Sequence, residues 1–389
     1  MQKLALAEKI VPLIAHMLLP AVLFGAALLW FYLGAPFGGG VTAGMHVFFY
    51  IFSFAGTIIL LYFNLSKALF SILSIVVAYV LINLLKNVGG ETYAASAAYQ
   101  NLSVLLPLNL LFFYFWPNHR FLSQKTVALL LGFFAEYALA EHLSRAGISL
   151  NLSTGSAENG FNLPSFGLFL VLSVCTFVNA VRHGDIWNYN AFFAGLFCGC
   201  GLYYSASPSG LTIFFLGAVL CLLLSITQNI YLETYYDPLT GLFSRNSFII
   251  HAKKFPVKYS LGIVSIDDYD KLAANFGKPV QNALIKLITA KLLELEKEDS
   301  IYRYSPDEFV IFYKNLDKNE TFERIETVRR AVASALFEYS PRKKALKLTI
   351  SGAVSEKKRQ DLTAFEVLVR ARKVLQKTRS FSHNVTSKA

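Results

Sequence analysis

The chain has 389 residues, of which 54% are hydrophobic and only 16% are charged, and its formal net charge is +11. Soluble domains average nearer a quarter charged residues, and the deficit here is uneven: residues 1–232 hold 8 Lys or Arg and 6 Asp or Glu, against 28 and 19 in residues 233–389. The composition therefore excludes one uniform soluble domain and predicts two parts in different solvents.

Residues 1–232 contain apolar segments long enough to cross a membrane as helices. A hydrocarbon core of about 30 Å needs about 20 mostly apolar residues per helix. The fourth of eight such segments is the weakest, because Pro107 and Asn109 interrupt it. The segments are 9–33, 41–63, 67–85, 97–117, 124–144, 164–182, 187–205 and 210–232. We predict a multi-span α-helical membrane domain of about eight helices over residues 1–232.

Basic residues between the segments predict the orientation, because short cytoplasmic loops are enriched in Lys and Arg. An even number of spans places both ends of the domain on one side of the membrane. With a cytoplasmic N-terminus, only Lys86 and Arg145 lie outside, and six basic residues lie inside. Those six are Lys3, Lys9, Lys67, Arg120, Lys125 and Arg182. This distribution predicts that the N-terminus and the second domain are both cytoplasmic.

Ionisable residues inside spans are costly and usually face a cavity or a partner. Glu136 in the fifth segment and His46 in the second are therefore candidate sensor residues. Glu141, nearer the external end of the same segment, is equally explained as an interfacial residue without a function. The external loop 145–164, rich in Ser, Asn and Gly, is either a lid over a pocket or a connector.

After residue 232 the apolar pattern changes to short runs that alternate with amphipathic stretches, which is typical of an α/β sheet domain. We predict strands over 259–266, 301–304, 309–313 and 346–354, the second and third forming a hairpin. Helices are predicted over 280–295, 321–335 and 364–379. No heptad repeat separates this domain from the last span, so any signal passes through a short helix.

Several motifs of the second part resemble one enzyme family. The run Asp-Pro-Leu-Thr-Gly-Leu-Phe-Ser-Arg at 237–245 resembles the opening motif of GGDEF domains, the diguanylate cyclases, and the run Ser-Pro-Asp-Glu-Phe at 305–309 stands where they have their name motif. The segments 348–354 and 371–384 are similar to the late strand and closing helix. The resemblance covers residues 233–386 and implies a GGDEF-type central sheet flanked by helices over 233–389. The family condenses two GTP into cyclic di-GMP across a dimer.

The resemblance implies a Mg²⁺ site, because phosphoryl transfer needs a metal held by hard carboxylate oxygens. Ser265 occupies the position of one ligand carboxylate and Asp307 the position of the other. A neutral serine does not replace a charged ligand, although Asp267, two residues on, offers partial rescue. Glu308 follows Asp307 in the same motif. Mg²⁺ is expected only if a nucleotide is bound.

The family positions that contact the nucleotide base are also changed. Ala273 and Asn282 stand where an Asn and an Asp read guanine, and an amide offers one acceptor where a carboxylate offers two. Ser305 and Pro306 replace a glycine pair that permits positive φ and close approach. Proline fixes φ near −65°, which suits a turn but not that approach.

The phosphate and product positions show the same trend. Arg379 and His383 stand where the family has two cations at the triphosphate, so one is kept and one weakened; a solvated basic helix end explains them equally well. The product site, an Arg-x-x-Asp in many members, begins here with Glu296 and ends with Asp299. An anion in place of a guanidinium disfavours cyclic di-GMP binding of the usual kind.

Three hypotheses follow. The first is a bacterial inner-membrane signalling protein whose degenerate GGDEF domain is a pseudoenzyme that binds a partner, dimerises, or senses an unconventional nucleotide, with GTP and cyclic di-GMP as candidate ligands. The second is a weakly active diguanylate cyclase that uses Asp267, Asp307 and Glu308. The third is a membrane sensor or transport subunit with the GGDEF domain as regulatory module. The sequence shows no recognition helix or stacking platform, so nucleic-acid binding is not expected.

Overall fold

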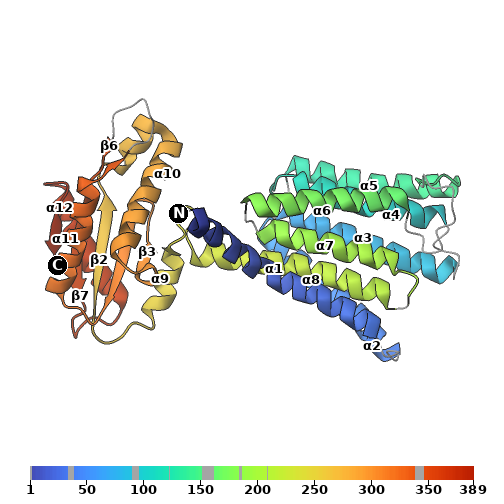
Figure 1. Ribbon diagram of the computed structural model, residues 1–389, viewed down its shortest axis with the longest axis horizontal. Coiled ribbons are helices and arrows are strands. Elements are labelled where there is room, and N and C mark those ends of the chain that lie inside the picture. The colour runs from blue at the N-terminus through green and yellow to red at the C-terminus, as the bar shows by residue number, and fades with distance from the viewer. Residues whose placement is uncertain are drawn as a thin grey trace. The chain divides into compact units, whose positions relative to one another are not determined.

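The computed structural model describes residues 2–33, 39–89, 96–121, 123–150, 162–183, 186–207, 209–337 and 346–389. The chain divides into two compact units, Met1–Asn229 and Ile230–Ala389, which are described separately (Figure 1). Most of the predicted external loop lies outside the described residues, so the choice between lid and connector is untested.

The regular elements in the described parts of the first unit are all helices, and they overlap the eight predicted segments. They are α1 (Gln2–Leu33), α2 (Gly39–Tyr62), α3 (Ser66–Gly89), α4 (Ala97–Phe115), α5 (Gln124–Arg145), α6 (Leu163–His183), α7 (Ile186–Tyr203) and α8 (Gly210–Tyr235). The α8 helix runs on past the end of the first unit, so the short connecting helix that we predicted is the last part of one continuous helix.

Six of the described helices are long and apolar enough to cross a membrane: α2, α3, α4, α5, α6 and α8. The described side chains of α1 form a shorter apolar stretch, Met17–Leu33, and α7 is not among the six. Large apolar side chains such as Phe54 and Leu163 are 70% and 68% exposed, as expected for lipid-facing positions. The predicted fold class is confirmed, whereas the count of eight spans and the cytoplasmic orientation remain predictions.

Helix α4 is central to the packing of the first unit, since it contacts α3, α5 and α6. Its Phe113 stacks on Phe70 of α3, with ring centroids 5.0 Å apart, and faces Phe133 of α5 at 6.1 Å. All three rings are almost fully buried. Pro107 lies inside α4, so it is tolerated within the helix rather than ending it.

The second unit is built on a six-stranded mixed sheet in the order β1-β3-β4-β2-β7-β8. The central strand β2 pairs antiparallel with β4 and β7, while β1 pairs parallel with β3 and β7 parallel with β8. The strands are β1 (Phe243–Ser244), β2 (Tyr259–Ile266), β3 (Ile301–Arg303), β4 (Glu308–Lys314), β7 (Ile350–Glu356) and β8 (Thr386–Lys388). The helices are α9 (Arg245–Ala252), α10 (Tyr269–Leu295), α11 (Lys318–Ser334) and α12 (Ala364–Arg379), with a short 3₁₀ turn η2 (Glu298–Ser300).

Alternation along the strands sends side chains into two cores, one on each face of the sheet. On β2, Val264 and Ile266 join the core under α10 and α11, whereas Leu261 and Ile263 join the core under α9 and α12. Ser265 therefore lies on the α12 side, which brings the end of that helix to it.

Two glycines on the α11 face make room for one isoleucine. A Cβ added to Gly262 on β2 would lie 2.5 Å from Ile325 Cδ1, and one added to Gly352 on β7 would lie 2.6 Å from Ile325 Cγ2. Ile325 is fully buried. The close approach of α11 to the sheet explains why glycine stands at both positions.

One predicted strand is wrong in its extent. The segment 346–354 is two strands: β6 (Leu346–Lys347) pairs with β5 (Leu336–Phe337) in a separate small sheet, and β7 begins only at Ile350. Between them the Thr349 carbonyl accepts from the Asp267 backbone N–H, which directs the chain across the end of β2. The other predicted strands and helices are present, with α10 longer than predicted and broken at Gly277, where φ is 78°.

Candidate functional site

The family motifs meet at one end of the sheet, where β2 ends, the β3–β4 hairpin turns and α12 finishes. A cavity of about 450 Å³ lies there. It is lined by Asp268, Tyr269, Asp270, Lys271, Pro306, Asp307, Arg379 and His383. Of the predicted site residues, the structure thus brings Pro306, Asp307, Arg379 and His383 together.

Ser265 and Asp307, the two predicted metal-ligand positions, are linked to each other and to Arg379. The Ser265 hydroxyl donates to Asp307 Oδ2 at 3.0 Å and accepts from Arg379 Nη1 at 2.8 Å. A second guanidinium nitrogen donates to the Ile266 carbonyl at 3.2 Å. The guanidinium lies 3.8 Å from Asp307 Oδ2 and 3.7 Å from Asp267 Oδ1. An arginine cation is therefore placed between two carboxylates.

Asp267 accepts three hydrogen bonds from elsewhere in the domain. Its oxygens accept from the Thr349 and Ser351 hydroxyls, each at 2.8 Å, and from the Asn384 backbone N–H at 3.0 Å. The residue is only 4% exposed and does not line the cavity. These contacts tie β2 to the loop before β7 and to the end of the chain.

Glu308 is also committed to a partner. Its carboxylate accepts from two nitrogens of Arg372 on α12, at 3.1 Å for Nε, and the hydrogen bonds raise the pKa of Arg372. The Arg372 guanidinium lies 5.4 Å from the Tyr304 ring centroid, and Arg245 lies 5.0 Å from the same ring. Glu308 thus binds one of the two arginines that lie over the Tyr304 ring.

The hairpin itself is held by internal hydrogen bonds. The Ser305 hydroxyl contacts Asp307 Oδ1 at 3.2 Å and Glu308 Oε2 at 3.0 Å. Arg303 donates to the Pro306 carbonyl at 2.9 Å and to Asp237 Oδ2 at 2.8 Å. The turn is therefore well formed with serine and proline at the glycine positions.

The remaining nucleotide positions contribute less. Asn282 is exposed on α10, and the Ala273 side chain lies outside the described residues, so the guanine-reading positions are untested. His383 Nδ1 lies 3.5 Å from Asp268 Oδ2, and a hydrogen bond from Lys271 lowers the pKa of Asp268. Lys271 and His383 at the rim of the cavity thus both lie beside the Asp268 carboxylate.

These residues do not fit a divalent cation as they are arranged. Mg²⁺ needs several free hard oxygens in octahedral geometry. Asp267 already accepts three hydrogen bonds, and Glu308 is paired with Arg372. Asp307 accepts hydrogen bonds from the Ser305 and Ser265 hydroxyls and lies 3.8 Å from the Arg379 guanidinium. Among the described residues no group of three or more His, Cys, Asp or Glu could hold a metal ion.

The product-site positions lie beside a second cavity, of about 730 Å³, walled in part by Phe312 and Tyr313. Tyr313 donates to Glu296 Oε1 at 2.9 Å, and burial raises the pKa of Glu296. Asp299 lines the same cavity and is exposed. The structure therefore places both predicted residues together, with an anion where the family has a guanidinium.

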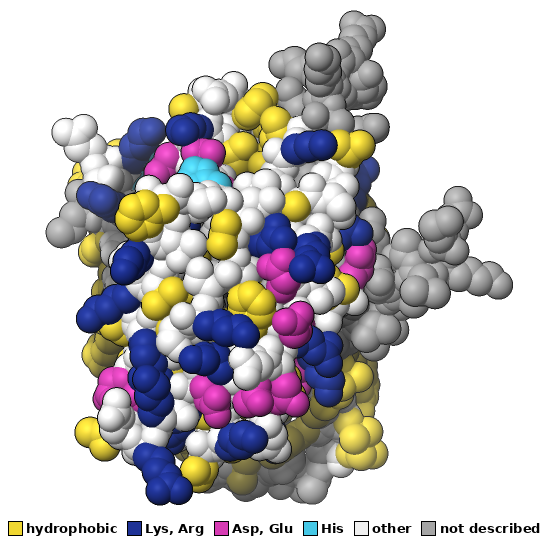
Figure 2. Space-filling view, turned by 90° about the vertical axis from the view of Figure 1, so that its left-hand side faces the viewer, with side chains coloured by type: hydrophobic (Ala, Val, Ile, Leu, Met, Phe, Trp, Pro, Cys, Tyr) yellow, Lys and Arg dark blue, Asp and Glu magenta, His cyan; other side chains and the backbone are white. Residues whose placement is uncertain are grey.

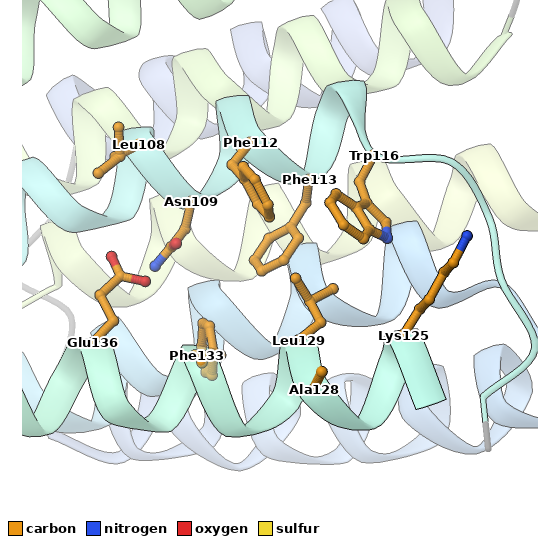
Figure 3. A pocket seen from close by; sticks show the side chains of 11 residues that line it. Leu108, Asn109, Phe112, Phe113, Trp116, Lys125, Ala128, Leu129, Phe133 and Glu136 are labelled. Atoms are coloured by element: carbon orange, nitrogen blue, oxygen red, sulfur yellow. The ribbon is translucent and has the colours of Figure 1, made fainter. Parts of the chain in front are cut away.

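The two membrane candidates have different surroundings. His46 contacts the Tyr79 hydroxyl through Nδ1 and the Thr212 hydroxyl through Nε2 at 3.4 Å, so it joins α2 to α3 and α8. Glu136 lines a cavity between α4 and α5 (Figure 3). Of the two, Glu136 is the one that lines a cavity among the described residues.

The sequence analysis missed two residues that belong to these sites, Arg372 and Asn109. Arg372 was grouped with solvated basic residues, although it lies seven positions before Arg379 and thus on the same helix face. Asn109 was read only as an interruption of a span, although it is 4% exposed and lines the cavity with Glu136. A polar residue inside an apolar segment was the available signal.

The comparisons with known proteins agree with this architecture. Residues 234–384 match the family model described as "Diguanylate cyclase, GGDEF domain". This part of the chain is a GGDEF domain, which confirms the resemblance drawn from the sequence. No curated protein matches the chain.

Solved structures of GGDEF proteins are similar at low identity. The GGDEF domain of DgcB from Caulobacter crescentus, in complex with c-di-GMP, is 18% identical, with 40% of this chain and 92% of that chain covered and a TM-score of 0.37. The FimX GGDEF domain of Pseudomonas aeruginosa is 19% identical, with 40% of this chain and 99% of that chain covered and a TM-score of 0.37. The diguanylate cyclase SiaD of the same organism, in complex with its activator SiaC, is 15% identical, with 68% of this chain and 90% of that chain covered and a TM-score of 0.38.

Proposed function

We propose that the chain is a membrane-embedded signalling or regulatory protein whose GGDEF domain no longer makes cyclic di-GMP and acts as a binding module. The module pairs with a second copy or with another signalling protein, or it senses an unconventional nucleotide. The supporting observation is that Asp267, Asp307 and Glu308 each have partners inside the domain. Carboxylates that already accept hydrogen bonds inside the domain gain less from a metal–nucleotide complex than free carboxylates do.

The proposed location is a bacterial inner membrane, with the GGDEF domain in the cytoplasm. The six apolar helices support the membrane, and the excess of Lys and Arg in alternate loops supports the orientation. Figure 2 shows basic side chains spread over one face of the second unit and interspersed with acidic ones. Such a mixed surface favours a protein partner over nucleic acid.

A weakly active cyclase is the second candidate. Asp307 favours it, because its side chain is 28% exposed and lines the 450 Å³ cavity. A third candidate, a membrane sensor or transport subunit with the GGDEF domain as regulator, is favoured by the cavity beside Glu136.

The test uses the full chain in lipid nanodiscs with GTP and Mg²⁺, and mass spectrometry measures cyclic di-GMP. Calorimetry measures the binding of GTP and of cyclic di-GMP with Mg²⁺ and then with EDTA. We expect no product and no Mg²⁺-dependent GTP binding. Product that disappears in Asp307→Asn and persists in Glu323→Gln, an exposed control on α11, would establish the cyclase instead.

A further inference from the structure

The cavity between α4 and α5 has one polar end in an otherwise apolar wall. Its volume is about 630 Å³, within the usual range of small-molecule sites of roughly 300–1,000 Å³. Figure 3 shows Phe112, Phe113, Leu129 and Phe133 along its length. Phe113 and Phe133 are buried and form the base, whereas Phe112 is 46% exposed at the rim.

Two polar atoms that line one end have no hydrogen-bond partner among the described residues. They are Asn109 Nδ2 and Glu136 Oε1, and both atoms are buried. Asn109 is 4% exposed as a whole, and in Figure 3 its amide and the Glu136 carboxylate point toward the same end of the cavity. Buried polar groups almost always have partners, so a ligand that accepts from Asn109 and donates to Glu136 would complete this end of the cavity.

The opposite end carries a cation. Lys125 lines the cavity beside Trp116 and has no ion-pair partner within the described part of the chain. It precedes Glu136 on α5 by eleven residues, which corresponds to about 16 Å along a helix. The cavity thus offers a positive charge at one end, aromatic walls, and hydrogen-bonding groups at the other end.

We propose that this cavity binds an acyl-chain amphiphile that carries an acidic head group at Lys125 and a hydroxyl group at the Asn109–Glu136 end, where the hydroxyl accepts from Asn109 and donates to Glu136. Water alone satisfies only the polar end, because an apolar cavity stays dry. A plain lipid tail fills the walls but leaves the two polar atoms of Asn109 and Glu136 unpaired. A chain with polar groups at both ends satisfies all parts of the site. This proposal goes beyond the function of the GGDEF domain and does not depend on it.

Gly132 provides a way to block the site without disturbing the fold. It lines the cavity, and an added Cβ would meet no atom within 4 Å. Leucine is also a better helix former than glycine. Gly167 on α6 has the same open surroundings and is not among the cavity residues, so Gly167→Leu is the matched control.

The experiment measures binding of tritiated ω-hydroxydodecanoic acid to the full chain in phosphatidylcholine nanodiscs that hold one chain each, with empty discs as background. Dodecanoic acid and dodecanol are the competitors that lack one polar end. We expect saturable binding, with the hydroxy acid preferred over dodecanoic acid roughly tenfold, as for one hydrogen bond to a buried group.

The variants separate the parts of the site. Gly132→Leu should abolish binding and Gly167→Leu should leave it unchanged. Asn109→Leu should still bind dodecanoic acid but lose the preference for the hydroxyl, and Lys125→Met should lose the preference for the carboxylate over dodecanol.

Two results would overturn the proposal: non-saturable uptake equal to that of empty discs, or unchanged binding by Gly132→Leu. Absence of binding together with a smaller dimer fraction of Gly132→Leu in detergent would assign the face to an interface between copies instead.

Discussion

The end of the GGDEF sheet where the family motifs meet and the α4–α5 cavity differ in how their polar groups are satisfied. At the end of the sheet, Asp267 and Glu308 are buried and both have partners within the chain. In the cavity, Asn109 is equally buried and Glu136 lies beside it, and their inward atoms have no partner among the described residues. The first site is complete without a ligand, whereas the second is not.

The difference matters because the net free energy of a hydrogen bond is small while an unsatisfied buried group is costly. A typical bond contributes about 1 kcal/mol, and an orphaned buried group costs about 1–3 kcal/mol. Side chains that serve a ligand are therefore left unsatisfied in its absence, and side chains that serve the fold are not. Each prediction below changes one group and tests on which side of this division it falls.

The largest effect is expected for Asp267→Ala. The substitution leaves the Thr349 and Ser351 hydroxyls and the Asn384 N–H without an acceptor, so we expect the α/β domain to lose about 3 kcal/mol of stability. Hydrogen exchange of β2 and β7 amides in the full chain measures this loss locally. Asp268→Asn, its exposed neighbour, is the control. An unchanged exchange rate would mean that Asp267 is a functional carboxylate, as the weak-cyclase hypothesis requires.

The second prediction compares two buried asparagines on α4. Asn101 donates to the Ser144 hydroxyl and the Ile148 carbonyl and accepts from the Leu150 N–H. Asn109 Nδ2 has no partner among the described residues. We expect Asn101→Leu to destabilise the helical unit by about 2 kcal/mol and Asn109→Leu to stabilise it by about 1 kcal/mol.

Tryptophan fluorescence during denaturation isolates this unit, because Trp30, Trp116 and Trp187 all belong to it. Equal destabilisation by the two substitutions would remove the distinction between the sites.

The third prediction concerns a substitution that leaves the carboxylates at the end of the sheet without one of their partners. Arg379→Met removes the cation between Asp267 and Asp307, so we expect a loss of about 1 kcal/mol and a new affinity for Mn²⁺. The measurement is the melting temperature of the domain with and without MnCl₂. Wild type should not respond, and Arg330→Met, at an exposed pair with Glu326, should behave like wild type. A response of wild type to Mn²⁺ would contradict the pairing argument.

More of the fold than of the site could be predicted from the sequence, because the patterns that predict helices and strands are local. Periodicity is local, so β2 and α12 were predicted with their observed bounds, and the apolar segments located all eight helices. The break at 348–349 depends on a contact between Thr349 and Asp267 that no local pattern contains. The strand over 346–354 was therefore predicted as continuous.

The same limit applies to the site residues. Sequence identified Ser265 and Asp307 as altered and retained ligand positions, but not that Arg379 links to both, since they lie on different elements. The rescue role proposed for Asp267 assumed a shared strand face and could not include its three donors, Thr349 before β7, Ser351 on β7 and Asn384. Identity of a residue is readable from sequence, whereas its state of pairing is not.

The smallest effect is expected for Glu296→Gln, because Glu296 lies between the two extremes. Its one hydrogen-bond partner among the described residues is the Tyr313 hydroxyl, and it is only partly buried beside its cavity. Burial raises its pKa in the fold above the ordinary 4.5, so the folded state disfavours the ionised form. The wild-type domain is thus relatively more stable below pH 4.5 and loses this contribution as pH rises through the folded pKa.

A glutamine keeps an acceptor for Tyr313 and cannot ionise. Glu296→Gln should therefore stabilise the domain slightly at neutral pH, and the difference should vanish below pH 4.5. Denaturation of both proteins across this range measures it. A variant that is instead less stable at neutral pH would show that the anion is held by a charge partner, with Arg324 of the same cavity the nearest choice, and would move Glu296 to the side of the completed sites.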